Sequence, residues 1–330
     1  MPSLTVIIPT ADRPDYLRVA LQSVASQSAR DQITDVLVSE NLGNEGSRAV
    51  CDEFPDLPIS YTLRDPQLGH PKHLGVLARE AQGDLIALLN DDDWWCPGHL
   101  AAGLDSLARH PDASAWHSAT VWTGSEDTND GHIHRELSLW NAAGKPDNWM
   151  SDWSYSPDQL LPLCWFYAPF HWTTMIARRE PLHDAAAEFD TEHAWNADRV
   201  LPARLVLHGD ILYSPQATGF ARLHGGNYAA DPEKVRQMQE ADAHWKEKLL
   251  GMAEKAGVDV PKVWARWLPD LKPESKEGFG KMLQRHYSVE EIEELGFDEL
   301  ATPFTERKTL KSLLRSAIPY GIVEAYRHSK

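Results

Sequence analysis

The chain has 330 residues, of which 42% are hydrophobic and 25% are charged, and its formal net charge is −17. This composition is that of a globular protein with room for one large domain and an appendage, or for two domains. The acidic balance argues against a general nucleic-acid-binding protein. Three cysteines without a CxxC motif argue against a disulfide framework or a zinc knuckle and are typical of a reducing cytoplasm. We expect neither a signal peptide nor a membrane span, since no apolar stretch approaches about 18 residues.

The first third of the chain alternates between strand-like and helix-like segments. Short β-branched runs predict buried strands, and apolar residues at i, i+3, i+4 and i+7 predict helices with one buried face. In chain order, the expected strands are 4–9, 34–41, 59–65 and 84–91, and the expected helices are 12–27, 45–54, 70–83 and 97–111. This alternation predicts an α/β fold with a mostly parallel, Rossmann-like sheet flanked by helices on both faces.

The rest of the chain has a less regular pattern. We expect a strand over 113–124, an irregular, tryptophan-rich and mobile segment over 125–165, a strand followed by a turn over 170–182, a helix within 189–209 and a strand over 210–227. From about residue 231, charged helical segments predominate. The predicted organisation is a catalytic domain over 1–230, with halves 1–115 and 116–230, and a helical C-terminal extension over 231–330.

Residues 85–100 read LIALLNDDDWWCPGHL, so an apolar strand runs directly into Asp91, Asp92 and Asp93. Carboxylates this close repel one another, and at least one is expected to stay protonated unless a cation lies between them. A solvated loop at a strand end is the simpler interpretation. The alternative is a metal site beyond the carboxyl ends of the parallel strands, where ligands bind in such sheets.

Two motifs decide between these interpretations. The segment VIIPTADRPDYLRVALQSVASQ resembles the opening of the family 2 glycosyltransferases, and GDLIALLNDDDWWCPGHL is similar to the aspartate motif of that family. The resemblance covers roughly residues 3–227. It implies the GT-A fold and an inverting transfer from a nucleotide-diphosphate sugar, linked to UDP, GDP or dTDP, with Mn²⁺ or Mg²⁺ as cofactor. A divalent cation of this kind prefers carboxylate ligands and neutralises the charge of a leaving diphosphate.

The resemblance also assigns roles to individual residues. Asp93 and His224 match metal-binding positions, with His224 alternatively contacting the diphosphate. The residues expected to bind the nucleotide sugar are Pro9, Thr10, Arg13, Glu40, Asn41, Lys72, Asp91, Asp92 and Arg222. Glu40 and Asn41 depart from the two aspartates usual in the family, which leaves the base preference open. Lys72 stands in place of an arginine and is equally compatible with a surface lysine.

An inverting transfer needs a carboxylate that takes the proton from the attacking acceptor hydroxyl. The family carries this base in a Glu-Asp motif, which HAWNADRVLPARL matches with Asp198 on the aspartate and Ala197 in place of the glutamate. We therefore expect Asp198 to be the base, with Asp190 and Glu192 as the next candidates. A salt bridge from Asp198 to Arg199 or Arg204 is the structural alternative. The tryptophans Trp94, Trp95, Trp165 and Trp172 are candidates for sugar stacking or for the core.

The tail is basic, in contrast to the rest of the chain. Residues 305–330 carry a net charge of +4, and the apolar residues 310, 313, 314, 317 and 318 predict an amphipathic helix. Such a helix binds an anionic membrane surface or packs on the catalytic domain or on a second subunit. The resemblance implies a saccharide or lipid-linked acceptor in bacterial surface polysaccharide or lipopolysaccharide synthesis, no nucleic acid partner, and a cytoplasmic enzyme that contacts the membrane or forms an oligomer. A nucleotidyltransferase and a non-catalytic sugar-nucleotide-binding protein are the alternatives.

Overall fold

The computed structural model describes residues 2–43, 45–124, 152–166, 168–187, 189, 197–224 and 232–270, and, within 276–301, residues 276–277, 280, 283–284 and 287–301. The chain divides into two compact units, Met1–Lys272 and Pro273–Lys330. The first unit contains the sheet and every residue of the candidate site. In the second unit the helices α12 (Val289–Glu294) and α13 (Asp298–Ala301) are described, and Ser288 and Glu291 form a capping box at the start of α12.

The N-terminal half of the sheet is parallel, as the alternating pattern predicts. Its elements are β1 (Leu4–Thr10), α1 (Pro14–Ala25), β2 (Ile33–Glu40), α2 (Glu45–Asp52), β3 (Ile59–Leu63), α3 (His70–Glu80) and β4 (Leu85–Leu88). The strands lie in the order β3-β2-β1-β4, and each neighbouring pair is parallel. All four therefore end at the same edge, and β4 ends three residues before the aspartate triplet.

The second half makes the sheet mixed. Its elements are β5 (Trp94–Trp95), α4 (His99–Arg109), β6 (Ala115–Thr123), β7 (Trp153–Tyr155), α6 (Pro157–Phe166), β8 (Met175–Arg178), α7 (Arg179–Ala187), α8 (Ala197–Leu205) and β9 (Ile211–Arg222). The order continues β8-β6-β9-β5, and β7 pairs with β9. Strand β8 is antiparallel to both β4 and β6, whereas β6 and β9 are parallel.

Two of the expected elements differ in the structure. The turn expected after the strand in 170–182 is the helix α7, because Leu182, Ala185 and Ala186 form a buried face that packs against α3. The segment expected to be irregular over 125–165 contains β7 and most of α6 where it is described, and its remainder lies outside the described residues. Helix α6 was missed because it is apolar on most sides, so it lacks the one-sided periodicity of a surface helix.

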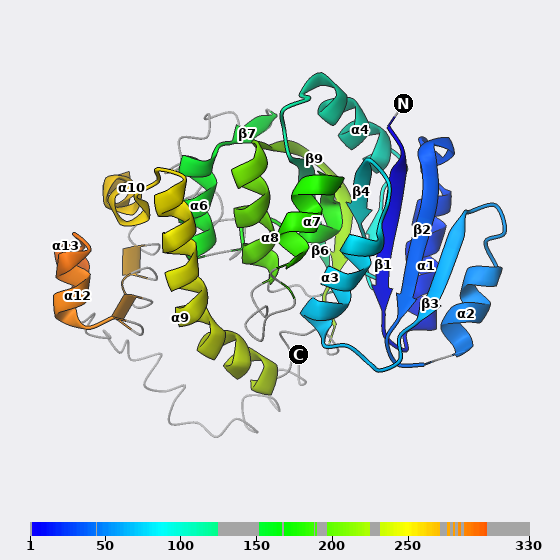
Figure 1. Ribbon diagram of the computed structural model, residues 1–330, viewed down its shortest axis with the longest axis horizontal. Helices are drawn as coiled ribbons and strands as arrows, with labels where there is room; N and C mark the ends of the chain where they lie inside the picture. Colours follow the sequence, from blue (N-terminus) through cyan, green and yellow to red (C-terminus); the bar gives the residue numbers. More distant parts are fainter. Residues whose placement is uncertain are drawn as a thin grey trace, which may run out of the picture. The chain divides into compact units, whose positions relative to one another are not determined.

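Helices cover both faces of the sheet (Figure 1). One face buries alternate residues of β1, including Leu4, Val6 and Ile8, in one cluster with apolar residues of α1 and α4. On the other face, α3 and α7 pack against each other and cover β1, β4 and β8. Helix α4 approaches the sheet closely at Gly103, where an added Cβ would lie 2.5 Å from Ile176 and 2.6 Å from Trp116.

The first compact unit extends past the domain boundary expected at residue 230. Helices α9 (Pro232–Lys255) and α10 (Val260–Trp267) pack against α6, and the indole Nε1 of Trp264 donates a hydrogen bond to the carbonyl of Pro162 at 2.7 Å. The C-terminal region is helical where it is described, as predicted. Among the described residues, no helix is long and apolar enough to cross a membrane. The predicted amphipathic helix over 305–330 lies outside the described residues.

Candidate active site

Four strand ends meet at the aspartate triplet. Strands β1 and β4 run parallel and end side by side, so the hydroxyl of Thr10 donates a hydrogen bond to Asp91 at 2.8 Å. Strand β8 runs the other way, which places the turn before it, 172–174, beside the end of β4. Strand β9 pairs with β5 directly after the triplet and ends at Arg222. Residues from four distant parts of the sequence therefore surround one set of carboxylates.

Asp91 and Asp92 are buried and contact the side chains of Arg13 and His224. The guanidinium of Arg13 donates to Asp92 at 2.9 Å and to Asp91 at 3.4 Å. Nε2 of His224 lies 3.1 Å from the same Asp92 carboxylate oxygen that Arg13 contacts most closely. The predicted residues Thr10, Arg13, Asp91, Asp92 and His224 are thus in direct contact with one another.

Asp93 points into a different set of contacts. Only 2% of the residue is exposed, and its carboxylate accepts hydrogen bonds from the Asn90 amide at 3.0 Å and from the backbone N–H of Arg222 at 2.9 Å. These bonds fix the carboxylate at the end of β4 and β9. Asp93 is not the cap of the following helix, since the N-cap of α4 is Gly98.

Burial and mutual repulsion disfavour negative charge on the triplet. Burial, followed by the charge of Asp92, raises the pKa of Asp91 to about 7, although Arg13 and the Thr10 hydroxyl oppose the shift. The same two causes raise the pKa of Asp93, against hydrogen bonds from Arg222, Asn90 and Thr173. The protein alone therefore does not fully compensate these carboxylates near neutral pH. A bound cation would complete the compensation.

The loop that holds Arg13 is ordered by Glu40. The Glu40 side chain is fully buried and accepts hydrogen bonds from the backbone N–H of Asp12 at 3.1 Å, from the N–H of Leu42 at 2.8 Å and from the Ser47 hydroxyl at 2.5 Å. Asp12 adopts a left-handed conformation with φ of 57°, which aspartate tolerates better than most residues. A base contact by Glu40, as predicted from the family, would have to compete with these three donors.

Three more of the predicted nucleotide-binding residues have no contact with the triplet in the described part of the chain. Asn41 exchanges two hydrogen bonds with the backbone of Leu68, at 2.6 and 2.8 Å, and so closes the loop after β3. Lys72 is exposed on α3, whereas its neighbour His73 is buried and hydrogen-bonded to Ser39 at 2.8 Å. Pro9 is half-buried in β1, one residue before Thr10.

Arg222 is held by aromatic rings. Its guanidinium carbon lies 5.0 Å from the centroid of Tyr16 and 4.9 Å from that of Trp94, and its Nε donates to the carbonyl of Asp92 at 3.1 Å. Trp94 in turn stacks on Phe220 at 5.2 Å. Cation–π contacts on two rings fix the guanidinium behind the triplet. Of the tryptophans considered for sugar stacking, Trp95, Trp165 and Trp172 are buried and belong to the core.

Asp198 lies in the first turn of α8, and its side chain is accessible to solvent. Protein nevertheless surrounds it closely enough that desolvation raises its pKa, which the neighbouring His171 partly offsets. Within the described residues no ion pair joins Asp198 to Arg199 or Arg204. The Arg199 guanidinium instead donates to the backbone carbonyls of Cys164 and Trp165. Asp190 and Glu192, the other candidates for the base, lie outside the described residues.

His171 is a site residue that the sequence analysis missed. Its Nδ1 lies 3.8 Å from Asp93. Burial lowers the pKa of His171, and the negative charges of Asp198 and Asp92 partly oppose this shift. It therefore lies close to both the triplet and the predicted base. The pattern FHWTT before a strand gives no hint of this position, because the direction of β8 relative to β4 decides it.

The carboxylates of the triplet are compatible with a divalent cation that takes most of its coordination from a bound diphosphate and water. Among the described residues, no group of three or more His, Cys, Asp or Glu side chains is arranged to hold a metal ion. Magnesium and manganese sites that act on diphosphates commonly use one or two carboxylates, with phosphate oxygens and water completing the shell. The incompletely compensated carboxylates of Asp91 and Asp93 fit that kind of site.

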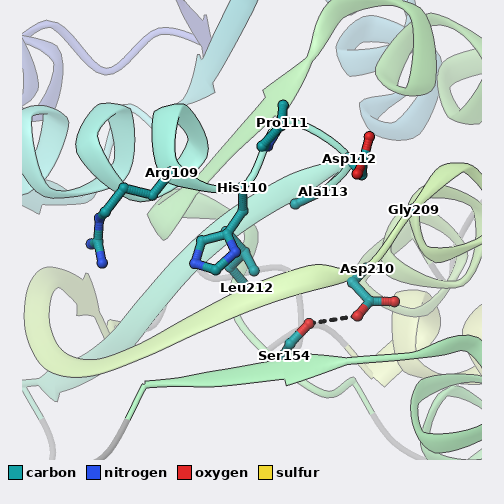
Figure 2. Close-up of a pocket in the computed structure, with 9 residues that line it drawn as sticks. All are labelled: Arg109, His110, Pro111, Asp112, Ala113, Ser154, Gly209, Asp210 and Leu212. Atoms are coloured by element: carbon teal, nitrogen blue, oxygen red, sulfur yellow. Dashed lines mark hydrogen bonds between the residues drawn. The ribbon is translucent and has the colours of Figure 1, made fainter.

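A separate hollow of ≈ 520 Å³ lies at the other end of the sheet (Figure 2). It is lined by residues that precede β6 and β9, among them Asp112, Gly209 and Asp210, and Ser154 donates to Asp210 at 2.7 Å. Arg222 and Thr123, near the triplet, stand at the opposite ends of these two strands. The hollow is therefore not part of the candidate active site.

Comparisons with known proteins agree with this geometry. The model of glycosyl transferase family 2 matches residues 5–181, which is more than half of the chain. Succinoglycan biosynthesis protein ExoW of Rhizobium meliloti (strain 1021) is 32% identical over 128 residues, covering 36% of this chain and 39% of its own length. GalNAc(5)-diNAcBac-PP-undecaprenol beta-1,3-glucosyltransferase of Campylobacter jejuni (strain ATCC 700819 / NCTC 11168) is 29% identical over 106 residues, covering 31% and 33%. The matches span less than half the length of these relatives.

Solved structures share the fold. S. aureus TarS 1-349 superposes with a TM-score of 0.54 at 14% identity, over 96% of this chain and 93% of that one. Mannosyltransferase PcManGT from Pyrobaculum calidifontis, in complex with GDP-Man and Mn2+, gives a TM-score of 0.51 at 14% identity, over 91% and 85%. The strand order and the carboxylates at its edge thus define a glycosyltransferase fold of the GT-A type. The chain belongs to glycosyl transferase family 2.

Proposed function

We propose that this chain is an inverting glycosyltransferase that moves a sugar from a nucleoside-diphosphate sugar to an acceptor hydroxyl. The observation that carries the proposal is that His171 lies near both the aspartate triplet and Asp198. Membership of the family supports the reaction class. The structures of TarS with UDP-GlcNAc and of PcManGT with GDP-Man support a nucleotide-sugar ligand for this fold.

In the proposed reaction the acceptor oxygen attacks the anomeric carbon on the face opposite the diphosphate. The bond from that carbon to the diphosphate oxygen breaks, and its electron pair leaves with the diphosphate. Asp198 takes the proton of the acceptor hydroxyl. Its raised pKa makes the carboxylate a stronger proton acceptor, and its accessible side chain can reach a hydroxyl delivered from solvent.

On the sugar-donor side, the proposal assigns Arg13 and Arg222 to the negative charge of the diphosphate. Both guanidinium groups are held in place by contacts within the protein. Arg13 is bound by the Asp91 and Asp92 carboxylates, and Arg222 lies against two aromatic rings. Such preorganised cations stabilise charge that develops on a leaving group. The family also assigns Pro9, Thr10, Glu40, Asn41 and Lys72 to this side, and these assignments stay predictions.

We further propose that Asp93 and His224 hold Mn²⁺ or Mg²⁺. When bound there, the ion would neutralise negative charge on the leaving diphosphate. The structure of PcManGT with Mn²⁺ supports a divalent ion in this fold. The His224 imidazole already contacts Asp92, so it lies within the same group of carboxylates.

The acceptor and the cellular setting are proposed from the relatives. The names of two of them place those proteins in succinoglycan synthesis and in transfer to an undecaprenol-linked acceptor. We propose a saccharide or lipid-linked acceptor for this chain, in the synthesis of a bacterial surface polysaccharide on the cytoplasmic side of the membrane. The three cysteines are not disulfide-bonded, which is compatible with that compartment.

The function is tested by titrating UDP-, GDP- and dTDP-sugars into the protein with and without Mn²⁺. We expect one base to bind preferentially, with affinity that rises when Mn²⁺ is present, and turnover once an acceptor is added. Binding without turnover with any acceptor would point to a sugar-nucleotide-binding protein instead. Release of pyrophosphate from a nucleoside triphosphate and a sugar phosphate would identify a nucleotidyltransferase.

The proposed membrane contact of the basic tail is tested separately. Full-length protein and a chain ending at Thr305 are mixed with vesicles that contain anionic lipid, and with neutral vesicles as control. We expect only the full-length protein to float with the anionic vesicles, since lysine and arginine side chains contribute about 1 kcal/mol each near such a surface. Equal flotation of both proteins would remove the membrane role. A change in the oligomeric state on truncation would point to a subunit contact.

A further inference from the structure

The imidazole of His171 has an unsatisfied polar atom in the candidate site. Its Nδ1 is buried and has no hydrogen-bond partner among the residues that the structure describes. The nearest carboxylate oxygen, on Asp93, lies 3.8 Å away, which is too long for a hydrogen bond. A buried nitrogen without a partner costs free energy in the folded protein. Such an atom beside a group of carboxylates expected to bind a ligand suggests that the ligand supplies the missing partner.

The backbone at His171 is fixed by hydrogen bonds, and its ring packs against Trp122. The backbone carbonyl of His171 accepts hydrogen bonds from the N–H of Thr174 at 3.3 Å and from the hydroxyl of Thr174 at 3.1 Å. The rings of Trp122 and His171 meet edge to face, with centroids 5.0 Å apart and ring planes at 78°. The side chain is only 18% exposed. It is therefore preorganised, and a ligand that binds to it loses little free energy in ordering the side chain.

The groups around the ring indicate which ligand atom it meets. Nδ1 lies 3.8 Å from Asp93, beside which the proposed function places the diphosphate of the sugar donor. The charge of Asp198 also reaches the imidazole and opposes the lowering of its pKa by burial. We propose that His171 is a positioning residue for the sugar donor, whose Nδ1–H donates a hydrogen bond to a diphosphate oxygen beside Asp93. The inference rests on the proposed function. It adds a contact from the acceptor half of the domain, which would fix the anomeric carbon relative to Asp198.

The test compares two substitutions of different shape. In His171→Asn, the side-chain amide nitrogen lies close to the position of Nδ1 and keeps a donor there, whereas His171→Ala removes it. The affinity of each variant is measured by calorimetry for UDP, GDP and dTDP, and for the corresponding monophosphates, with Mn²⁺ present. His110, an exposed residue of the separate hollow, provides the matched control His110→Ala.

We expect His171→Ala to weaken binding of the preferred diphosphate by roughly ten- to a hundred-fold, the usual effect of losing a hydrogen bond to a charged group. His171→Asn should stay within about threefold of the wild type on the same scale. In steady-state transfer, KM for the sugar donor should rise in His171→Ala while KM for the acceptor stays unchanged. Thermal unfolding should be similar in the wild type and His171→Asn, because no protein hydrogen bond is lost from the side chain among the described residues. His171→Ala also loses the contact with Trp122 and should unfold at a somewhat lower temperature.

Two results would overturn the inference. Equal diphosphate affinity in wild type and His171→Ala would show that Nδ1 does not contact the sugar donor. An equal loss of diphosphate and monophosphate affinity in both variants, together with a lower unfolding temperature, would show a structural role. If the wild type bound none of the three diphosphates, the proposed function would fail first, and the inference with it.

Discussion

Replacing Asp198 by asparagine tests the assignment of the base most directly. Asparagine keeps the shape of the side chain, but its amide does not accept a proton near neutral pH. A general base typically contributes between about 10²- and 10⁴-fold to a rate, so we expect kcat for transfer to fall by that factor. Affinity for the nucleotide sugar should not change, because Asp198 makes no contact with the aspartate triplet among the described residues.

The structure also predicts that this variant folds normally. Arg199, the adjacent cation, is bound to the carbonyls of Cys164 and Trp165 and does not depend on Asp198. The substitution removes a negative charge from the first turn of α8, which costs about 0.3–1 kcal/mol. It also removes the unfavourable desolvation that raises the pKa of this carboxyl. These effects oppose each other, so the free energy of unfolding should change by less than about 1 kcal/mol.

The assay measures release of the nucleoside diphosphate in the presence of acceptor, with binding of the sugar donor followed by calorimetry. Asp184→Asn is the matched control, since Asp184 is an exposed carboxylate on α7 that pairs only with the exposed His208 among the described residues. Transfer activity above about a tenth of the wild type in Asp198→Asn would refute the assignment. Asp190→Asn and Glu192→Gln would then be the next variants to measure.

Three further predictions test the triplet and the fold. The folded-state pKa of Asp91 is raised to about 7, so the stability that its protonated form contributes is present below about pH 4 and is lost as the pH rises through about 7. Mn²⁺ should therefore raise the unfolding temperature more at pH 8 than at pH 5.5. Equal shifts at the two pH values would argue against a cation at the triplet. Arg13→Gln should weaken binding of the sugar donor by roughly tenfold or more, measured by calorimetry, because it removes the cation assigned to the diphosphate and leaves Asp91 and Asp92 without their guanidinium partner. Unchanged affinity would place the diphosphate elsewhere. Gly103→Ala should lower the free energy of unfolding by about 1–3 kcal/mol in urea titrations, since its Cβ would meet Ile176 and Trp116. Gly98→Ala has open space around its Cβ and should cost less than about 1 kcal/mol, as a change at the N-cap of α4.

The sequence by itself determined the parallel half of the fold and the position of the aspartate triplet. Buried β-branched runs, helix periodicity and short connections are local properties, so they predict β1 to β4 and the helices between them. Parallel strands end at a common edge, and the triplet was therefore expected there. Thr10 and Arg13, which are predicted to bind the nucleotide sugar, lie in this half, and the structure places both against the triplet.

Tertiary structure decided the second half of the site. His171 reaches the triplet because β8 runs antiparallel to β4, and Arg222 does so because β9 pairs with β5. Strand direction and pairing between segments 80 to 130 residues apart depend on the packing of the whole sheet, and local patterns do not encode them. For the same reason, the sequence did not predict the contacts of Glu40, which was expected to bind the nucleotide sugar and whose carboxylate the fold buries under three hydrogen-bond donors.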